Sequence, residues 1–106
     1  FIYICFMDIV EISKVLANQT RVNILKWLKN PEANFPPHQE IDHFDDGVCV
    51  GFIQDKTGLS QSTISTYLNS MQNVNLVIPT RHGKWTYYRR NEKVIEGYLK
   101  ALQQEL

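Results

Sequence analysis

Two short helical patterns joined by a glycine, within residues 48–73, constrain the fold of this chain more than any other feature. The second pattern follows Ser60, a favoured N-cap residue, and its apolar side chains recur at the i, i+3, i+4 and i+7 positions of a half-buried helix. They are Ile64, Tyr67, Leu68 and Met71. Gly58 supplies the unrestricted backbone that a tight turn from the preceding helix, over residues 48–57, requires. The pattern predicts two packed helices joined by that turn.

The other side of the second helix consists of uncharged hydrogen-bonding side chains. It spans an arc of about 140° at 100° per residue. Its members are Gln61, Ser62, Ser65, Thr66 and Asn69. Base edges in the major groove of DNA present both donors and acceptors, and short hydroxyl and amide groups let a helix backbone approach them. The arc is therefore a candidate surface for reading DNA, and an ordinary solvated helix face is the alternative.

A β-hairpin is predicted after this helix. Residues 75–80 and 85–90 have strand composition, and the turn 81–84 between them contains Gly83, where positive φ is expected. Pro79 lacks an N–H and therefore places the first strand at a sheet edge. Cationic side chains at the tip could contact phosphates or the adjacent minor groove. These are Arg81, His82 and Lys84.

Helical spacing predicts three more helices and one loop. A first helix is expected over residues 8–16, capped by Asp8, and a second over residues 18–29, stopped by Pro31. Asn91 is expected to cap a last helix with a broad apolar stripe, which on so small a domain suggests packing against another subunit. Residues 30–47 contain three prolines and five acidic residues. They are expected to form a long acidic loop with one helical turn near 39–44.

The charges of the chain are unevenly distributed although the formal net charge is zero. Residues 48–90 carry five basic side chains and one acidic one, whereas residues 1–47 carry four basic and seven acidic ones. A local electropositive patch, rather than the total charge, determines whether a surface binds phosphates. The middle of the chain is therefore expected to meet a polyanion, and the acidic loop to point away from it.

The size of the chain suits one domain over residues 8–106, because 106 residues with 43% hydrophobic content can bury one modest core. No segment reaches the ~18 consecutive apolar residues of a membrane span, and two cysteines fit a reducing compartment. A soluble cytoplasmic protein is expected. Residues 1–7 lack the flanks of a secretory signal. Either they precede a native start at Met7, or they form an arm buried against a partner subunit.

The predicted order of elements is helix, helix, helix, turn, helix, hairpin, helix, which is that of a winged helix-turn-helix, mainly α with a small β-hairpin. Three blocks resemble the ArsR/SmtB family of bacterial winged-helix repressors, namely "LANQTRVNILKWL", "TGLSQSTISTYLNSM" and "NLVIPTRHGKWTYYR". Asn75 stands at a wing position where the family usually has glycine, a mild change because Asn tolerates left-handed backbone. The resemblance implies a homodimeric repressor that binds an inverted-repeat operator in double-stranded DNA and leaves it when an effector is sensed.

The resemblance also places candidate residues. Those expected to bind DNA are Ser60, Gln61, Ser62, Thr63, Ser65, Thr66, Asn69, Arg81, His82 and Lys84. The first and last helices are expected to form the dimer interface. Its candidate residues are Ile9, Ile12, Leu16, Ile95, Tyr98, Leu99 and Leu102. Arg89 and Arg90 could equally contact phosphate or serve surface solubility.

No cofactor or metal is predicted, because the family's metal-binding patterns are incomplete. In "GVCVGFI", Cys49 occupies the first cysteine position of many relatives and Gly51 the second, and residues 91–106 contain no histidine. A thiophilic metal needs about three or four ligands, so Cys49 is expected to be a small buried apolar residue. One alternative is a redox pair or partial metal site of Cys5 and Cys49 with His38 or His43. Another is a cation held by the loop through His38, Asp42, His43, Asp45 and Asp46.

Two functional classes compete with DNA-binding repression. A winged helix that only mediates protein–protein contacts would leave the basic hairpin incidental. An enzyme is not expected, because no nucleophile, base and orienting group can be assembled from the spacing. The effector is not indicated by any residue pattern.

Overall fold

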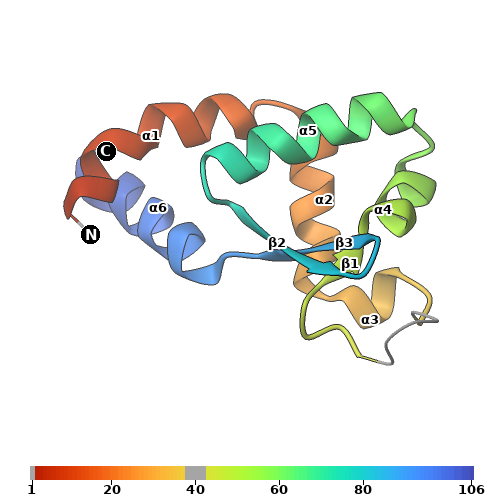
Figure 1. Cartoon of the computed structure of the whole chain (residues 1–106). Helices are drawn as coiled ribbons and strands as arrows, with labels where there is room; N and C mark the ends of the chain where they lie inside the picture. The colour runs from red at the N-terminus through yellow and green to blue at the C-terminus, as the bar shows by residue number, and fades with distance from the viewer. Residues whose placement is uncertain (1, 38–42) are drawn as a thin grey trace.

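The computed structural model describes the backbone of residues 2–37 and 43–106, and the side chains from Ile9 onward within those ranges. The chain forms a helical layer and a small antiparallel sheet, with both termini at one end of the molecule (Figure 1). The elements in chain order are α1 (Ile2–Leu16), α2 (Gln19–Lys29), α3 (Pro31–Asn34), β1 (Val48–Cys49), α4 (Val50–Thr57), α5 (Gln61–Asn73), β2 (Val77–His82), β3 (Trp85–Arg90) and α6 (Glu92–Glu105).

This order confirms the predicted winged helix-turn-helix. Helix α5 packs against both α2 and α4, and α1 lies beside α6 at the end that carries the termini (Figure 1). The hairpin of β2 and β3, called the wing below, projects at the other end, where α5 also begins. None of the described helices has the length and apolar content needed to cross a bilayer.

The sheet has three strands in the order β1-β3-β2, rather than the two of the predicted hairpin. Val48 and Cys49 pair with Tyr88 and Tyr87 of β3. The expectation that a helix begins at Val48 is therefore wrong, because both residues are buried in the sheet and α4 starts only at Val50. Strand β2 pairs with β3 alone in the described sheet, which confirms the edge position predicted from Pro79.

Local capping signals place three helix starts as predicted. The side-chain oxygens of Asn18, Ser60 and Asn91 accept hydrogen bonds from backbone N–H groups in the first turns of α2, α5 and α6. Asp8 was the wrong start for the first helix, since α1 begins at Ile2 and continues through it. The sequence from Ile2 to Asp8 contains no glycine or proline that would end a helix.

The long loop is shorter than predicted. Pro31 does not only end α2 but also begins α3, where its missing N–H costs no hydrogen bond. The helical turn predicted near 39–44 lies for the most part outside the described residues. The other end of the loop is fixed by β1, so that the residues just before Val48 lie against β3.

One core joins all layers. Its fully buried side chains come from α1, α2, α4, α5 and the sheet. They include Ile12, Ile24, Ile53, Ile64, Leu68, Met71, Leu76 and Val77. Ile12 is therefore corrected from a dimer-interface residue to a core residue, because it is 0% exposed within a single chain.

Positive backbone φ occurs where the sequence predicts turns. Gly58, at φ 72°, ends α4 and turns the chain into α5. Asn75 adopts φ 63°, so the residue that replaces the family's usual glycine keeps the left-handed conformation. The wing turn is tighter than expected, because strand pairing continues to His82 and Trp85 and leaves only Gly83 and Lys84 in the turn.

Candidate nucleic-acid interface

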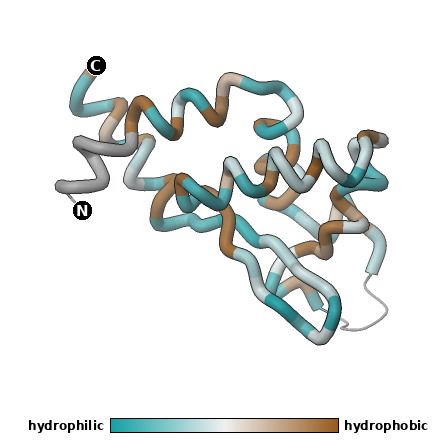
Figure 2. The backbone as a smooth tube through the Cα atoms, turned by 45° about the horizontal axis from the view of Figure 1, so that its top comes forward, coloured by the Kyte–Doolittle hydropathy of each residue, from teal (hydrophilic) through white to brown (hydrophobic). Residues whose placement is uncertain are grey.

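Helix α5 has one buried and one outward side, as predicted. Ile64, Leu68 and Met71 are each 0% exposed and pack in the core. The polar side faces outward, and the described structure places no other element over its exposed residues. Gln61, Ser62, Thr66 and Asn69 are exposed, and Thr63 and Ser65 are partly buried. The alternating hydropathy along this helix is visible in Figure 2. The groove-reading role of these residues stays a prediction.

The hydroxyl groups at the start of α5 largely bond to the helix itself. Ser60 Oγ accepts from the Thr63 N–H at 3.3 Å and lies 2.9 Å from Thr63 Oγ1. Thr66 Oγ1 donates to the carbonyl oxygen of Ser62 at 2.9 Å. Ser60 and Thr63 therefore act first as a cap. Their hydroxyls remain able to accept further hydrogen bonds.

Two amides on the same side are unengaged. The side chains of Gln61 and Asn69 make no hydrogen bond to any other described residue. With Ser65 between them, they occupy positions i, i+4 and i+8, which lie in one row along a helix surface. We call Gln61, Ser65 and Asn69 the polar row. It is the part of α5 with the most free donors and acceptors.

The wing carries cations at its tip. Arg81 and Lys84 are exposed. Arg81 Nε donates to the carbonyl oxygen of Gly83 at 2.9 Å, and Lys84 Nζ lies 5.6 Å from the centre of the Trp85 ring. Trp85 is 40% exposed beside them. Trp85 is not among the residues predicted to bind DNA, although its place directly after the Gly83-Lys84 turn is a signal in the sequence.

His82 differs from the other tip residues because its ring is already bound within the protein. Its Nε2 lies 2.5 Å from Oδ2 of Asp46, and its ring meets Tyr87 edge to face with centroids 5.3 Å apart. The expectation that the acidic loop points away from the DNA-binding side is therefore wrong for Asp46. Pairing of β1 with β3 brings the end of the loop alongside the wing.

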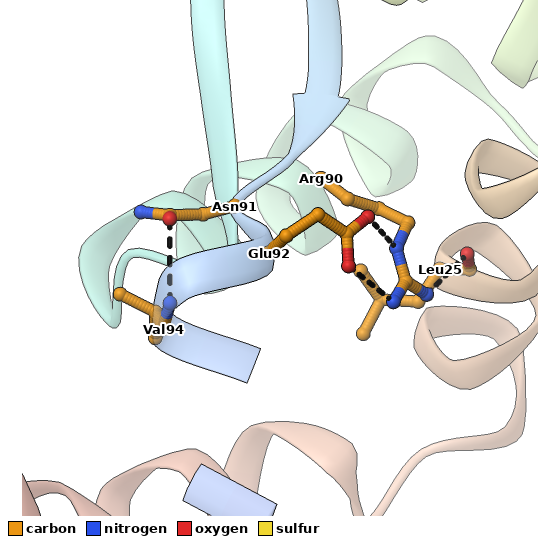
Figure 3. A network of polar contacts seen from close by, with 5 residues as sticks. All are labelled: Leu25, Arg90, Asn91, Glu92 and Val94. Atoms are coloured by element: carbon orange, nitrogen blue, oxygen red, sulfur yellow. Dashed lines mark hydrogen bonds and ion pairs between the residues drawn. The ribbon is translucent and has the colours of Figure 1, made fainter. Parts of the chain in front are cut away.

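Arg90 has a structural position, whereas Arg89 is exposed. The Arg90 side chain is 13% exposed and donates to both carboxylate oxygens of Glu92, at 2.7 and 2.9 Å, and to the carbonyl oxygen of Leu25 at 3.2 Å (Figure 3). The hydrogen bonds from Arg90 hold the pKa of the Glu92 carboxyl below its ordinary value against the opposing effect of partial burial, with a smaller contribution from the charges of Arg90 and Lys29. Arg90 thus joins the start of α6 to α2.

The metal candidates do not assemble in the described residues. Cys49 is buried, which confirms its prediction as a small apolar residue. His43 Nδ1 lies 3.6 Å from Asp45 Oδ2. Among the side chains described, no three of His, Cys, Asp and Glu gather closely enough to hold a metal ion. His38, Asp42 and the side chain of Cys5 lie outside the described residues, so the absence of a metal site stays a prediction.

The candidate dimer helices contact each other within one chain. Ile95, Tyr98 and Leu16 are partly buried against the core, and Ile9 and Leu102 are also partly buried. Leu99 is 57% exposed, and Val10, which is not among the predicted interface residues, is 61% exposed. The exposed apolar side chains of this helix pair are thus fewer than predicted but present on both helices.

Comparison with known proteins gives two relatives and one solved structure of note, and no family model matches the sequence. The chain is 42% identical over 100 residues to YbzH, an HTH-type transcriptional regulator of Bacillus subtilis, covering 94% of this chain and 100% of that protein. It is 29% identical over 82 residues to a Halobacterium salinarum protein named "Putative arsenical resistance operon repressor ArsR2", covering 77% of this chain and 58% of that protein.

The solved structure is that of Mb0332 from Mycobacterium bovis. It is described as a homodimeric winged helix-turn-helix DNA-binding domain and a possible ArsR-family transcriptional regulator. Its TM-score with this chain is 0.64 at 26% identity, covering 94% of this chain and 82% of the other. The fold of this neighbour and the names of the two sequence relatives both belong to transcriptional regulators.

Proposed function

Because this chain belongs to the ArsR family of winged helix-turn-helix transcriptional regulators, we propose that it is a homodimeric repressor that binds an inverted-repeat operator in double-stranded DNA. The observation that carries this proposal is the two-sided form of α5. Ile64, Leu68 and Met71 on its apolar side are fully buried, so the helix is held firmly, and its outward side is uncharged and rich in hydrogen-bonding groups. A helix presented in this way can lie in the major groove.

The polar row is the proposed base-reading element. Asn and Gln side chains can pair bidentately with the N6 and N7 atoms of adenine. Gln61 and Asn69 are eight positions apart, which corresponds to about 12 Å along a helix axis at 1.5 Å per residue. The two amides would therefore reach different base pairs. Ser65 between them can accept or donate to either base type.

The wing supplies the sequence-independent part of the affinity. Arg81, Lys84 and Arg89 are exposed, and none of them has a carboxylate partner within the described residues. Cations in this position contact phosphates and release counterions from the duplex. Arg90 is not part of this set, because Glu92 and Leu25 already hold its guanidinium.

Dimerisation is proposed to use the outward sides of α1 and α6, where Val10 and Leu99 are exposed. A two-fold dimer would present two copies of α5 to half-sites one helical turn apart, about 34 Å. The same proposal places the protein in the cytoplasm with the DNA and gives it no catalytic activity. The effector is not assigned.

The test is selection of bound fragments from random duplex DNA by the purified protein. The proposal predicts a palindrome whose half-sites are centred about one turn apart, and binding that weakens steeply as salt is added. Binding without any enriched sequence would contradict the proposal of a sequence-specific repressor. Absence of salt-sensitive duplex binding would favour the alternative, a winged helix that only mediates protein–protein contacts.

A further inference from the structure

The tip of the wing is bound to the loop before β1 by one side-chain contact. Asp46 and His82 are 36 positions apart in the sequence, yet Oδ2 of Asp46 lies 2.5 Å from Nε2 of His82. His82 is the last residue of β2 and directly precedes the Gly83-Lys84 turn. The edge-to-face contact with Tyr87 holds the same ring from β3. The imidazole therefore links the loop to both strands of the wing.

The backbone next to Asp46 is fixed against β3. Gly47 has φ 96°, and a Cβ at this position would collide with the carbonyl oxygen of Tyr88. Only glycine allows such close approach of two backbones. The following residue, Val48, is fully buried and paired with Tyr88. Asp46 thus extends from a rigid part of the structure.

Strand β1 supports the middle of the wing but not its tip. Strand β1 has two residues, which pair with Tyr87 and Tyr88, whereas β3 begins at Trp85. The outer part of the hairpin therefore has no β1 residue beside it. Isolated two-stranded hairpins are marginally stable in water. The Asp46–His82 contact adds a hydrogen bond to this unsupported part.

The position of this carboxylate is unfavourable for DNA binding by charge alone. Asp46 lies in the loop beside the hairpin that exposes Arg81 and Lys84, and a negative charge there repels phosphates. If Asp46 acted only through its charge, removing it would raise the affinity of the protein for DNA. Its contact with His82 indicates a structural role in addition.

We propose that Asp46 is a positioning residue for DNA binding, which holds the wing tip at a fixed orientation relative to α5 through its hydrogen bond to His82. This inference rests on the proposed DNA-binding function. With the tip held, Arg81 and Lys84 can reach the backbone while the polar row occupies the groove. The entropy cost of ordering the hairpin is then met when the protein folds, and it does not reduce the free energy of DNA binding.

Charge and position predict opposite effects of removing Asp46, and Asp45 provides a matched control. The Asp45 side chain is 86% exposed and contacts His43 rather than the wing. Asp45→Ala removes one negative charge and should raise affinity for every duplex slightly. Asp46→Ala removes the same charge but should lower affinity for a selected operator by about threefold to fivefold. Asp46→Asn removes the charge yet keeps an acceptor, and should retain wild-type affinity or exceed it.

The measurement is fluorescence anisotropy of labelled operator with each full-length variant, after thermal unfolding has shown that all of them remain folded. If Asp46→Ala gains affinity as Asp45→Ala does, Asp46 is only a nearby charge and the inference is wrong. A double variant, Asp46→Ala with His82→Ala, should lose no more affinity than Asp46→Ala alone. A larger loss of affinity in the double variant than in Asp46→Ala would also contradict a shared contact.

A second measurement needs no DNA and separates this inference from the proposed function. Amide hydrogen exchange of the free protein should become faster at residues 81–86 in Asp46→Ala but not in Asp45→Ala. Unchanged exchange at the wing would overturn the inference even if operator binding is confirmed. Failure of the wild-type protein to bind any duplex would instead overturn the proposed function, and with it the DNA-positioning role.

Discussion

The hydroxyl oxygens of Ser13 and Tyr98 lie 2.7 Å apart and join α1 to α6 across 85 positions of the sequence. This contact turns one side of each helix toward the other within a single chain. It leaves Val10 and Leu99 exposed, at 61% and 57%. The surface available to a second copy is therefore made by two helices that are already fixed together.

Leu99→Asp should separate the proposed dimer into folded monomers. A charge at an apolar interface would have to be desolvated when the copies meet, whereas an exposed position in the monomer tolerates it. Analytical ultracentrifugation gives the mass, and far-UV circular dichroism checks the helices. Gln104→Asp, at an exposed position on another side of the same helix, should stay dimeric. A Leu99→Asp protein that keeps the dimer mass would place the interface elsewhere.

Replacing both amides of the polar row should remove specificity and leave the fold intact. Gln61→Ala with Asn69→Ala removes two bidentate pairs, each worth about 1–3 kcal/mol of discrimination between bases. Binding to the selected operator should fall toward the level of random duplex, while the salt dependence remains. Gln104→Ala on α6 is the control and should bind as wild type. Preserved operator preference in the double variant would count against reading by this row.

Lys84→Ala should weaken binding to all duplexes alike. Loss of one phosphate contact reduces the slope of log K against log salt by about one unit. Titrations at several salt concentrations measure the slope with operator and with random duplex. A loss confined to one sequence would make Lys84 a base contact instead.

Arg90 and Glu92 should contribute to stability rather than to DNA affinity. Because the pKa of Glu92 is lowered in the folded chain, its contribution is present above the pKa of the unfolded state and is lost as pH falls through the folded value. Glu92 is 61% exposed, so the contribution should stay below about 1 kcal/mol.

The check compares unfolding free energies of wild type and Glu92→Gln between about pH 7 and 3. The difference in unfolding free energy between wild type and Glu92→Gln should shrink as the pH falls. Glu96→Gln, on the exposed side of the same helix and without an ion pair among the described residues, should show no such trend. A constant difference for Glu92→Gln would mean that the carboxylate charge does not stabilise the fold.

Features encoded by neighbouring residues could be predicted from the sequence. The caps at Asn18, Ser60 and Asn91 and the positive φ of Gly58 are set within one helical turn. The buried side of α5 followed from its period of apolar residues. These signals sufficed for the order of elements and for the outward polar side of α5.

Features that depend on distant partners could not be predicted. Val48 and Cys49 continue the apolar pattern of the next helix, and only pairing with Tyr87 and Tyr88 makes them a strand. The same pairing brings Asp46 to His82. Ile12 has the spacing of an interface residue, but the core closes over it. Periodicity shows which side of a helix is apolar, and the tertiary packing decides what covers it.

The two tryptophans of the chain lie in separate parts of the molecule, which gives the protein a built-in optical reporter. Trp27 is partly buried in α2 beneath Lys56, whose Nζ lies 5.4 Å from its ring centre, and Trp85 is exposed on the wing. Trp27→Phe would leave a single indole whose emission follows the wing. Approach of a duplex could then be observed without attaching any dye to the protein.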